Sequence, residues 1–319
     1  MGEGHDEPLP ADMPEEALRA EDEQNAHATF SAKDTRMNRP LKEAFAAGKG
    51  HLGEMRAALE SLFHVAGLVG SAELRDLYLL RFLMASKYNV SDAVEKFRTM
   101  VAFRERHRMD EVRKKFEEGS MKYWEIPGFK EHFACCPDTF RLVSGCAKDG
   151  SPVAIAGVTR WDYDAYYKLD EALENSFQMY HMEFMLLTLD KMSLSTGKLC
   201  GNVKILDLDG VTLAQRSQMK INDQHRKQRY ERLGANLEFC YPELASKICI
   251  VNSPSFVTIL WWTAKMFLPQ RVIDKVLIVR KHDTKTTLLS LVDASVLPSQ
   301  FGGTFSGAWE MGKIDYTKL

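Results

Sequence analysis

Residues 241–279 read YPELASKICIVNSPSFVTILWWTAKMFLPQRVIDKVLIV, and this stretch decides the fold class. It holds two short runs rich in Ile and Val, Lys247–Asn252 (KICIVN) and Lys275–Val279 (KVLIV), which are typical of buried strands. Between them, residues 256–268 are apolar except for two threonines and one lysine. A helix that is apolar nearly all round is either buried on every side or faces lipid on one side. The stretch therefore predicts a strand, a helix and a second strand.

The same alternation continues upstream. Pro152–Val158 (PVAIAGV) and Asn202–Leu208 (NVKILDL) are further strand candidates. Long helical patterns cover about 164–192, 211–236 and 255–268. Strands that alternate with helices imply a largely parallel sheet with crossover helices. The fold class predicted for this part of the chain is α/β.

The part that precedes the strands is predicted to be helical. From Glu54 to about Glu118, apolar residues recur at three- and four-residue steps and no strand pattern is present. The helical pattern breaks at Lys87-Tyr88-Asn89, where Asn89 or Ser91 can cap the next helix. We expect a small N-terminal helical bundle.

These patterns divide the chain into four parts. They are a mobile polar tail (1–50), a helical domain (51–120), the α/β domain (121–305) and a C-terminal tail (306–319). The glycines in GKGHLG, residues 48–53, spell the GxGxxG of dinucleotide sites. The preceding LKEAFAA looks helical, whereas that motif needs a strand before it, so a flexible linker is predicted instead.

Composition excludes several classes of function. A net charge of −2 provides no global attraction to nucleic acid. The six cysteines form no CxxC pair, and no histidine spacing completes a zinc set, so neither a metal nor a cofactor is expected. No nucleophile elbow or comparable catalytic motif occurs, which predicts a protein that is not an enzyme. His181, in a dense apolar pattern, is read as a core residue rather than a base.

The termini and the apolar run bear on location. The acidic start has no apolar segment of a secretory signal, which predicts a cytoplasmic, reducing environment with free thiols. A monomer is expected, although the sequence leaves the oligomeric state open. Residues 256–268 are too short for a membrane span, which needs about 20 apolar residues, but they can dip into a bilayer. Thr317-Lys318-Leu319 is close to the peroxisomal signal S-K-L, and whether it acts as one is left open.

The ordered series of motifs resembles the CRAL-TRIO family of lipid-binding domains. Residues 241–279 followed by LPSQFGG (297–303) look like the C-terminal half of such a domain, and LLRFLMASKYNVSDAVEKF (79–97) looks like its helical cap. The resemblance covers about residues 55–305. It implies the CRAL-TRIO fold, in which a small, mostly parallel sheet floors an apolar pocket for one lipophile and a mobile gate helix closes it.

The resemblance also implies residues for a lipid headgroup. In phosphatidylinositol-binding members, the positions of Lys87, Glu243 and Lys275 contact the inositol phosphate. Two ammonium groups can neutralise a phosphodiester while a carboxylate accepts hydrogen bonds from hydroxyl groups. Ser86 stands where many members have an arginine, so one phosphate contact is missing.

The residues that bind phosphatidylcholine in other members do not carry over. Ala154 and Ala156 stand where the first core strand has a tyrosine and a glutamate, and Asn202 and Lys204 replace a pair of hydroxyl residues. Phosphatidylcholine should therefore bind poorly. Asn202 and Lys204 are candidate polar residues of the pocket. Lys204 either pairs with an acidic ligand group or reaches the rim of the pocket.

The apolar run between the last two strands is the candidate gate, although an ordinary core helix remains the alternative. Two adjacent tryptophans close to Lys265 suit a membrane interface. Gly302 and Gly303 match the family's hinge, since glycine allows a positive φ. The predicted gate residues are Phe256, Ile259, Leu260, Trp261, Trp262 and Phe267.

The predicted function is the binding of a single hydrophobic ligand and its transfer between, or presentation at, membranes. A phosphatidylinositol-type phospholipid is the expected ligand, and transient contact with a membrane surface is expected. Two alternatives stay open: a carrier of a tocopherol- or retinoid-like lipophile, and a lipid-sensing signalling adaptor that recruits a protein partner through residues 1–50.

Overall fold

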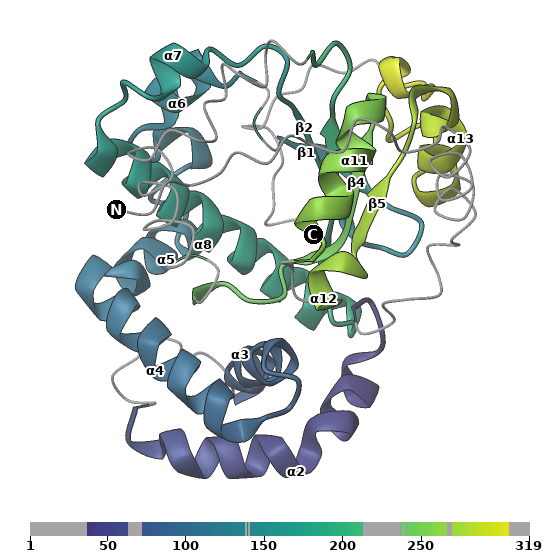
Figure 1. The fold of residues 1–319 in the computed structure, drawn as a ribbon. Coiled ribbons are helices and arrows are strands. Elements are labelled where there is room, and N and C mark those ends of the chain that lie inside the picture. Colours follow the sequence, from purple (N-terminus) through teal and green to yellow (C-terminus); the bar gives the residue numbers. More distant parts are fainter. Residues whose placement is uncertain are drawn as a thin grey trace, which may run out of the picture.

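The computed structural model describes residues 37–62, 72–137, 139, 141–212, 237, 240–266 and 270–305. In chain order its elements are α2 (Leu41–Leu59), η1 (Glu60–Leu62), α3 (Ala72–Ala85), α4 (Val90–His107), α5 (Met109–Glu117), η2 (Tyr123–Glu125), α6 (Phe129–Cys135), β1 (Arg141–Cys146), β2 (Pro152–Gly157), α7 (Tyr163–Tyr166), α8 (Glu171–Thr196), β3 (Asn202–Asp207), β4 (Ala245–Val251), α11 (Ser255–Ala264), α12 (Gln270–Ile273), β5 (Val276–Ile278), α13 (Lys281–Leu291) and η3 (Ser299–Phe301). Figure 1 shows the sheet between α8 and α13, with α2, α3 and α4 below them.

The sheet has the order β1-β2-β3-β4-β5. The β2–β3, β3–β4 and β4–β5 pairs are parallel, as the alternation of strands and helices predicts. β1 pairs antiparallel with β2 and was not predicted. Its sequence, RLVSGC, has a single β-branched residue, so it lacks the composition of a strand. It is placed by the turn that follows, in which the Ala147 N–H donates to the Ser151 carbonyl at 2.7 Å.

One face of the sheet is packed completely. It points toward α13 and η3, and every residue of this core cluster is almost fully buried. Because side chains alternate along a strand, the residues between them face the opposite side, toward α8. The fully buried cluster consists of Ala147, Val153, Ile155, Val203, Ile205, Cys249, Val251, Val279, Leu288, Val292, Leu297 and Phe301.

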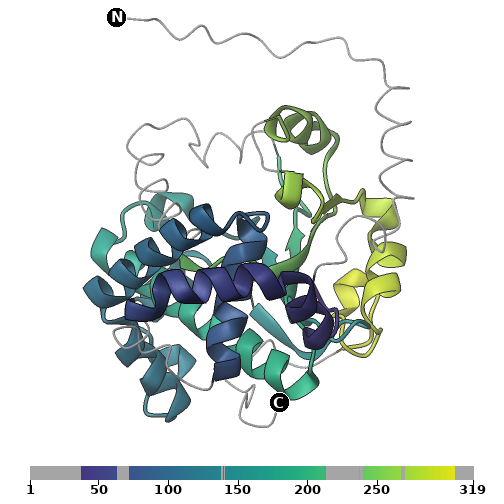
Figure 2. The ribbon, with the colours of Figure 1, turned by 90° about the horizontal axis from the view of Figure 1, so that it is seen from below.

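The N-terminal helices form the predicted bundle, with the predicted break. Lys87 and Tyr88 both have positive φ, which ends α3, and the Asn89 side chain caps α4 by accepting from the Asp92 N–H at 3.0 Å. Figure 2, seen from below, shows α2 running across this layer.

The linker predicted at GKGHLG was wrong, because these residues lie inside α2. Gly48 is buried, and a Cβ there would meet Leu80 Cδ1 at 3.3 Å, so the missing side chain lets α2 approach α3 closely. The motif sits in no strand-to-helix turn. Since α2 begins at Leu41, it also crosses the expected boundary at residue 50.

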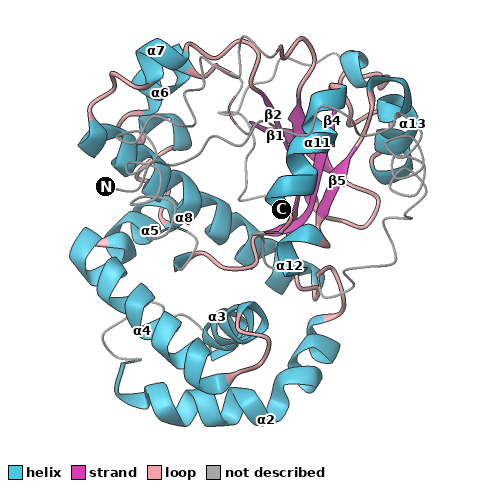
Figure 3. Cartoon of the chain, in the orientation of Figure 1, coloured by secondary structure: helices cyan, strands magenta, loops and turns pink. Residues whose placement is uncertain are grey.

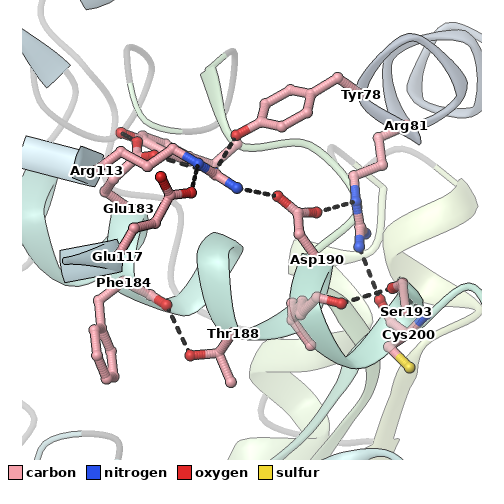
Figure 4. A network of polar contacts seen from close by, with 12 residues as sticks. Tyr78, Arg81, Arg113, Glu117, Glu183, Phe184, Thr188, Asp190, Ser193 and Cys200 are labelled. Atoms are coloured by element: carbon pink, nitrogen blue, oxygen red, sulfur yellow. Dashed lines mark hydrogen bonds and ion pairs between the residues drawn. The ribbon is translucent and has the colours of Figure 1, made fainter. Parts of the chain in front are cut away.

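The helical layer and α8 share a single hydrophobic core. Figure 3 shows helices filling this side of the molecule, with the strands gathered on the other. A buried ionic network joins the same elements (Figure 4). Arg113 of α5 donates to Asp190 of α8 at 3.1 Å and to the Tyr78 hydroxyl at 2.7 Å, and Arg104 donates to Glu183 at 2.7 Å.

Several predicted segments lie outside the described residues. They are the tail up to residue 36, most of the helix expected at 211–236, and the C-terminal segment that holds Thr317-Lys318-Leu319. Among the described residues, no helix combines the length and the apolar character that crossing a membrane requires.

Candidate functional site

Two of the three predicted headgroup residues form a buried ion pair. Glu243 lies two residues before the strand β4, and Lys275 directly precedes β5, so the parallel pairing of these strands brings the two side chains to one edge of the sheet. The Lys275 Nζ donates to Glu243 Oε2 at 2.5 Å. Both side chains are less than a tenth exposed. Removing two charged groups from water costs free energy that their attraction barely offsets, so a buried ion pair stabilises a fold weakly at best. Stability alone therefore does not explain this pair.

A second cation shares the Glu243 carboxylate. Arg271 of α12 places its Nη1 3.5 Å from Glu243 Oε1 and donates to the Ala85 carbonyl at 3.0 Å. Ala85 is the last residue of α3, so Arg271 joins the start of β5 to the helical layer.

Lys87 lies two residues after Ala85 and is not part of the ion pair. Its side chain is exposed and makes no ion pair with any residue that the structure describes. The turn around it is tight, with φ of 52° at Lys87 and 63° at Tyr88. The structure therefore brings Glu243 and Lys275 into contact and leaves Lys87 at the rim, two residues from the carbonyl that Arg271 holds.

The backbone of Glu243 is fixed by a buried arginine. Glu243 has a φ of 58°, a backbone conformation that residues other than glycine rarely adopt. Arg81 of α3 donates to the Glu243 carbonyl at 2.8 Å and to the Cys200 carbonyl at 3.0 Å. Its Nε lies 3.7 Å from Asp190 Oδ1, so the ionic network of Figure 4 reaches the candidate site.

The sheet face toward α8 is apolar but incompletely covered. Register alignment places Ala154, Lys204, Ile248 and Val276 in one row across four strands. The next row on this face is Ala156, Leu206, Ile250 and Ile278. The two alanines are buried, whereas the other six residues are only half-buried, in contrast to the packed opposite face.

Lys204 is the polar member of these rows. Burial lowers the pKa of Lys204, and the nearby Lys275 lowers it further. On α8, burial together with the charge of Lys204 lowers the pKa of His181 to about 3, so this imidazole is neutral. The Tyr123 hydroxyl lies 2.7 Å from His181 Nδ1. His181 is thus a buried, hydrogen-bonded core residue, as the sequence predicts.

Asn202 is the first residue of β3, and its side chain is buried. Its N–H donates to the Leu244 carbonyl at 2.8 Å, and its own carbonyl accepts from Ser246 Oγ at 3.0 Å. Its Oδ1 makes no hydrogen bond in the described part of the chain. Asn202 is two residues before Lys204, so alternation along β3 puts both on the same face, but Asn202 is buried whereas Lys204 is half-buried.

The predicted gate helix is present as α11 and is shorter than predicted. Phe256, Leu260 and Trp261 are half-buried, while Thr258 is buried. Met266, just beyond the helix, is 67% exposed. The side chains of Ile259 and Trp262, and all of Phe267, lie outside what the structure describes.

Each of the two glycines of the FGG motif is required for a different structural reason. Gly302 has a φ of 82°, which confirms the expected turn. Gly303 has no positive φ. A Cβ on Gly303 would collide with the Leu297 carbonyl oxygen, so a close approach of two backbones requires the glycine. Whether these residues act as a hinge stays a prediction.

Sequence reasoning missed Arg271 and Arg81. Arg81 carried a signal, because it is a charged residue inside the apolar LLRFL run and must find a buried partner. Arg271 carried none, since its contacts exist only once α12 meets the end of α3. In the described residues no cluster of His, Cys, Asp and Glu could hold a metal ion.

Comparisons with known proteins agree with this geometry. The model of the CRAL/TRIO domain family matches residues 140–303. The chain is 26% identical over 261 residues to the Sec14 cytosolic factor of Schizosaccharomyces pombe, covering 80% of this chain and 84% of that protein. It is 26% identical over 239 residues to the phosphatidylinositol/phosphatidylcholine transfer protein SFH4 of Arabidopsis thaliana, covering 73% of this chain but 36% of that protein.

A solved structure shows the same fold. The crystal structure of Sfh5 matches with a TM-score of 0.50 and 15% sequence identity, over 81% of this chain and 94% of that one.

Proposed function

The chain belongs to the CRAL/TRIO domain family, and from this premise we propose that it binds one phosphatidylinositol-type phospholipid and transfers or presents it between membranes. The family is one of lipid binding and transfer, and its relatives here include a Sec14 factor and a named phosphatidylinositol/phosphatidylcholine transfer protein. We propose the inositol lipid for this chain from its own residues.

The buried Glu243–Lys275 pair is the observation that carries the proposal. It lies where the half-buried apolar face ends, because Lys275 directly precedes Val276 of the first row. A phospholipid needs this combination: an apolar surface for its acyl chains and, at one end, cations for its phosphate beside a carboxylate for hydroxyl groups. Lys87 at the rim would add a second ammonium group.

We propose that α11 is the gate and that the protein acts from the cytoplasm by brief contact with membranes. The support is an apolar helix whose described side chains are mostly half-buried, followed by the exposed Met266. Such a surface gains free energy in a bilayer interface. No chemical step is proposed, so the protein would be a carrier rather than an enzyme.

Removing the cation of the site tests the proposal. Lys275→Ala deletes a charge-assisted contact of about 1.5–3 kcal/mol, so phosphatidylinositol transfer between vesicles should fall about tenfold or more. Lys87→Ala should lower the rate less, since Lys87 is exposed. Lys281→Ala is the matched control, because Lys281 is an exposed lysine of α13. Transfer that Lys275→Ala and Lys87→Ala both leave unchanged would contradict the assignment.

A further inference from the structure

Arg271 is a cation of the candidate site that the sequence did not predict. Its guanidinium donates to the Ala85 carbonyl at 3.0 Å and lies 3.5 Å from the Glu243 carboxylate. The side chain is 19% exposed, compared with 2% for that of Glu243, so Arg271 can be reached from outside. We propose, as an extension of the function above, that Arg271 is a direct ligand of the lipid phosphate.

The geometry of the Glu243 carboxylate supports this role. Lys275 binds one oxygen at 2.5 Å, while Arg271 approaches the other at 3.5 Å, beyond the 2.7–3.2 Å of an ordinary hydrogen bond. The Arg271 guanidinium is attracted to the Glu243 carboxylate by its charge, but the two groups are too far apart for a close hydrogen bond. A phosphate can accept two parallel hydrogen bonds from the planar fork of an arginine, which a single lysine cannot provide.

The surroundings leave the guanidinium pre-oriented. The bond to the Ala85 carbonyl fixes Nη1 against the end of α3. The hydrogen bond from Lys96 is the main cause of the lowered pKa of Asp92, burial opposes it, and the charge of Arg271 makes a smaller contribution to the lowering. Arg271 thus lies between the first turn of α4 and Glu243. Pre-orientation of this kind reduces the conformational entropy that binding would otherwise cost.

The test compares Arg271→Gln with a control of the same chemistry. Arg108→Gln removes an arginine that is 75% exposed and pairs only locally with Glu111. Labelled phosphatidylinositol is moved between phosphatidylcholine vesicles, and thermal unfolding gives the folded fraction of each variant. We expect Arg271→Gln to lose transfer by about tenfold, as for a lost charge-assisted contact, while Arg108→Gln stays within about twofold of the parent.

The outcomes separate this inference from the proposed function. If Lys275→Ala impairs transfer and folded Arg271→Gln does not, Arg271 is only a structural tie and the inference is overturned. If neither impairs transfer, the proposed function falls as well. Inhibition of transfer by low concentrations of inorganic phosphate would make a free anion the ligand and would also contradict the lipid assignment.

A variant that retains the charge covers the case in which Arg271→Gln does not fold. Arg271→Lys keeps a cation near Glu243 but loses the planar fork. The ³¹P NMR resonance of bound phosphatidylinositol should then move in Arg271→Lys and stay in place in Arg108→Gln. An unmoved resonance in Arg271→Lys would show that the guanidinium does not touch the phosphate.

Discussion

Glu243 combines a strained backbone with a buried charge. A left-handed conformation costs a non-glycine residue about 1 kcal/mol or more, and it persists only where the surroundings hold it. Here Arg81 holds the carbonyl, while Lys275 and Arg271 hold the carboxylate. Strain that is over-determined in this way is typical of functional positions, which agrees with a binding role for Glu243.

His181 predicts how stability depends on pH. Its pKa is about 3 in the folded chain, below the 6.5 of an exposed histidine. Between these two pH values the unfolded chain binds a proton at His181 that the folded chain does not bind. Stability should be greatest above pH 6.5 and fall as the pH drops toward 3, by about 2 kcal/mol between pH 7 and 5 from this group alone.

Denaturant unfolding of His181→Gln at both pH values measures this contribution. Gln can still accept from the Tyr123 hydroxyl but does not titrate, so this part of the pH dependence should disappear. His282→Gln, at an exposed histidine of α13, is the control and should behave like the parent protein. A parent protein and a His181→Gln variant with the same pH dependence would show that His181 is not buried in its neutral form.

Residues of the candidate site that belong to a sequence motif could be predicted. Residues that join the site only through tertiary contacts could not. Glu243 and Lys275 were predicted because each stands in a motif that resembles the CRAL-TRIO family, the Glu in YPE and the Lys in KVLIV. Arg271 was missed because its contact with Ala85 joins residues 186 positions apart. Lys87 is exposed in a turn whose positive φ values no pattern of residue types predicts, so its absence from the ion pair was not foreseen.

At the scale of elements, α11 is the part on which the transfer mechanism depends. A lipid leaves an apolar site only if one wall moves and its apolar side chains find an environment other than water. Trp261 is half-buried in α11, and a tryptophan that enters a bilayer interface gains up to about 4–6 kcal/mol, less what it already buries.

We therefore expect Trp261→Ala to weaken vesicle association and lipid transfer while the fold stays nearly as stable. Trp124→Ala is the matched control, since Trp124 is 44% exposed and lies on η2. Vesicle co-sedimentation and thermal unfolding check both variants. If Trp261→Ala lowers stability by several kcal/mol and leaves membrane binding of the folded fraction unchanged, α11 is a core helix and the gate lies elsewhere.

Elements with a clear hydrophobic period were predictable, and those placed by their neighbours were not. The periodic runs of β2, β3 and β4 appear as expected, while the helix expected at about 164–192 is divided into the short α7 and the long α8. β1 has one β-branched residue and becomes a strand because the turn after it returns the chain to β2. The glycines of GKGHLG favour a linker by composition, but the packing of Gly48 against Leu80 stabilises a helix through them.

At the scale of the whole molecule, buried polar contacts join the helical layer to the candidate site at the edge of the sheet. Burial raises the pKa of Glu183, but the guanidinium groups of Arg104 and Arg113 outweigh it and leave the pKa lowered, so the carboxylate stays charged. The same network reaches Arg81 and through it the Glu243 carbonyl. The helical layer therefore positions the ligand site and does more than cover it.

The identity of the bound lipid tests the central claim most directly. The chain is produced in a eukaryotic host and its native mass is measured, with competition between labelled phosphatidylinositol and phosphatidylcholine. We predict one phosphatidylinositol per chain, lost in Lys275→Ala, and little phosphatidylcholine, because Ala154 and Ala156 offer no polar group to a choline phosphate. Equal uptake of the two phospholipids, or a bound lipophile without phosphate, would contradict the account.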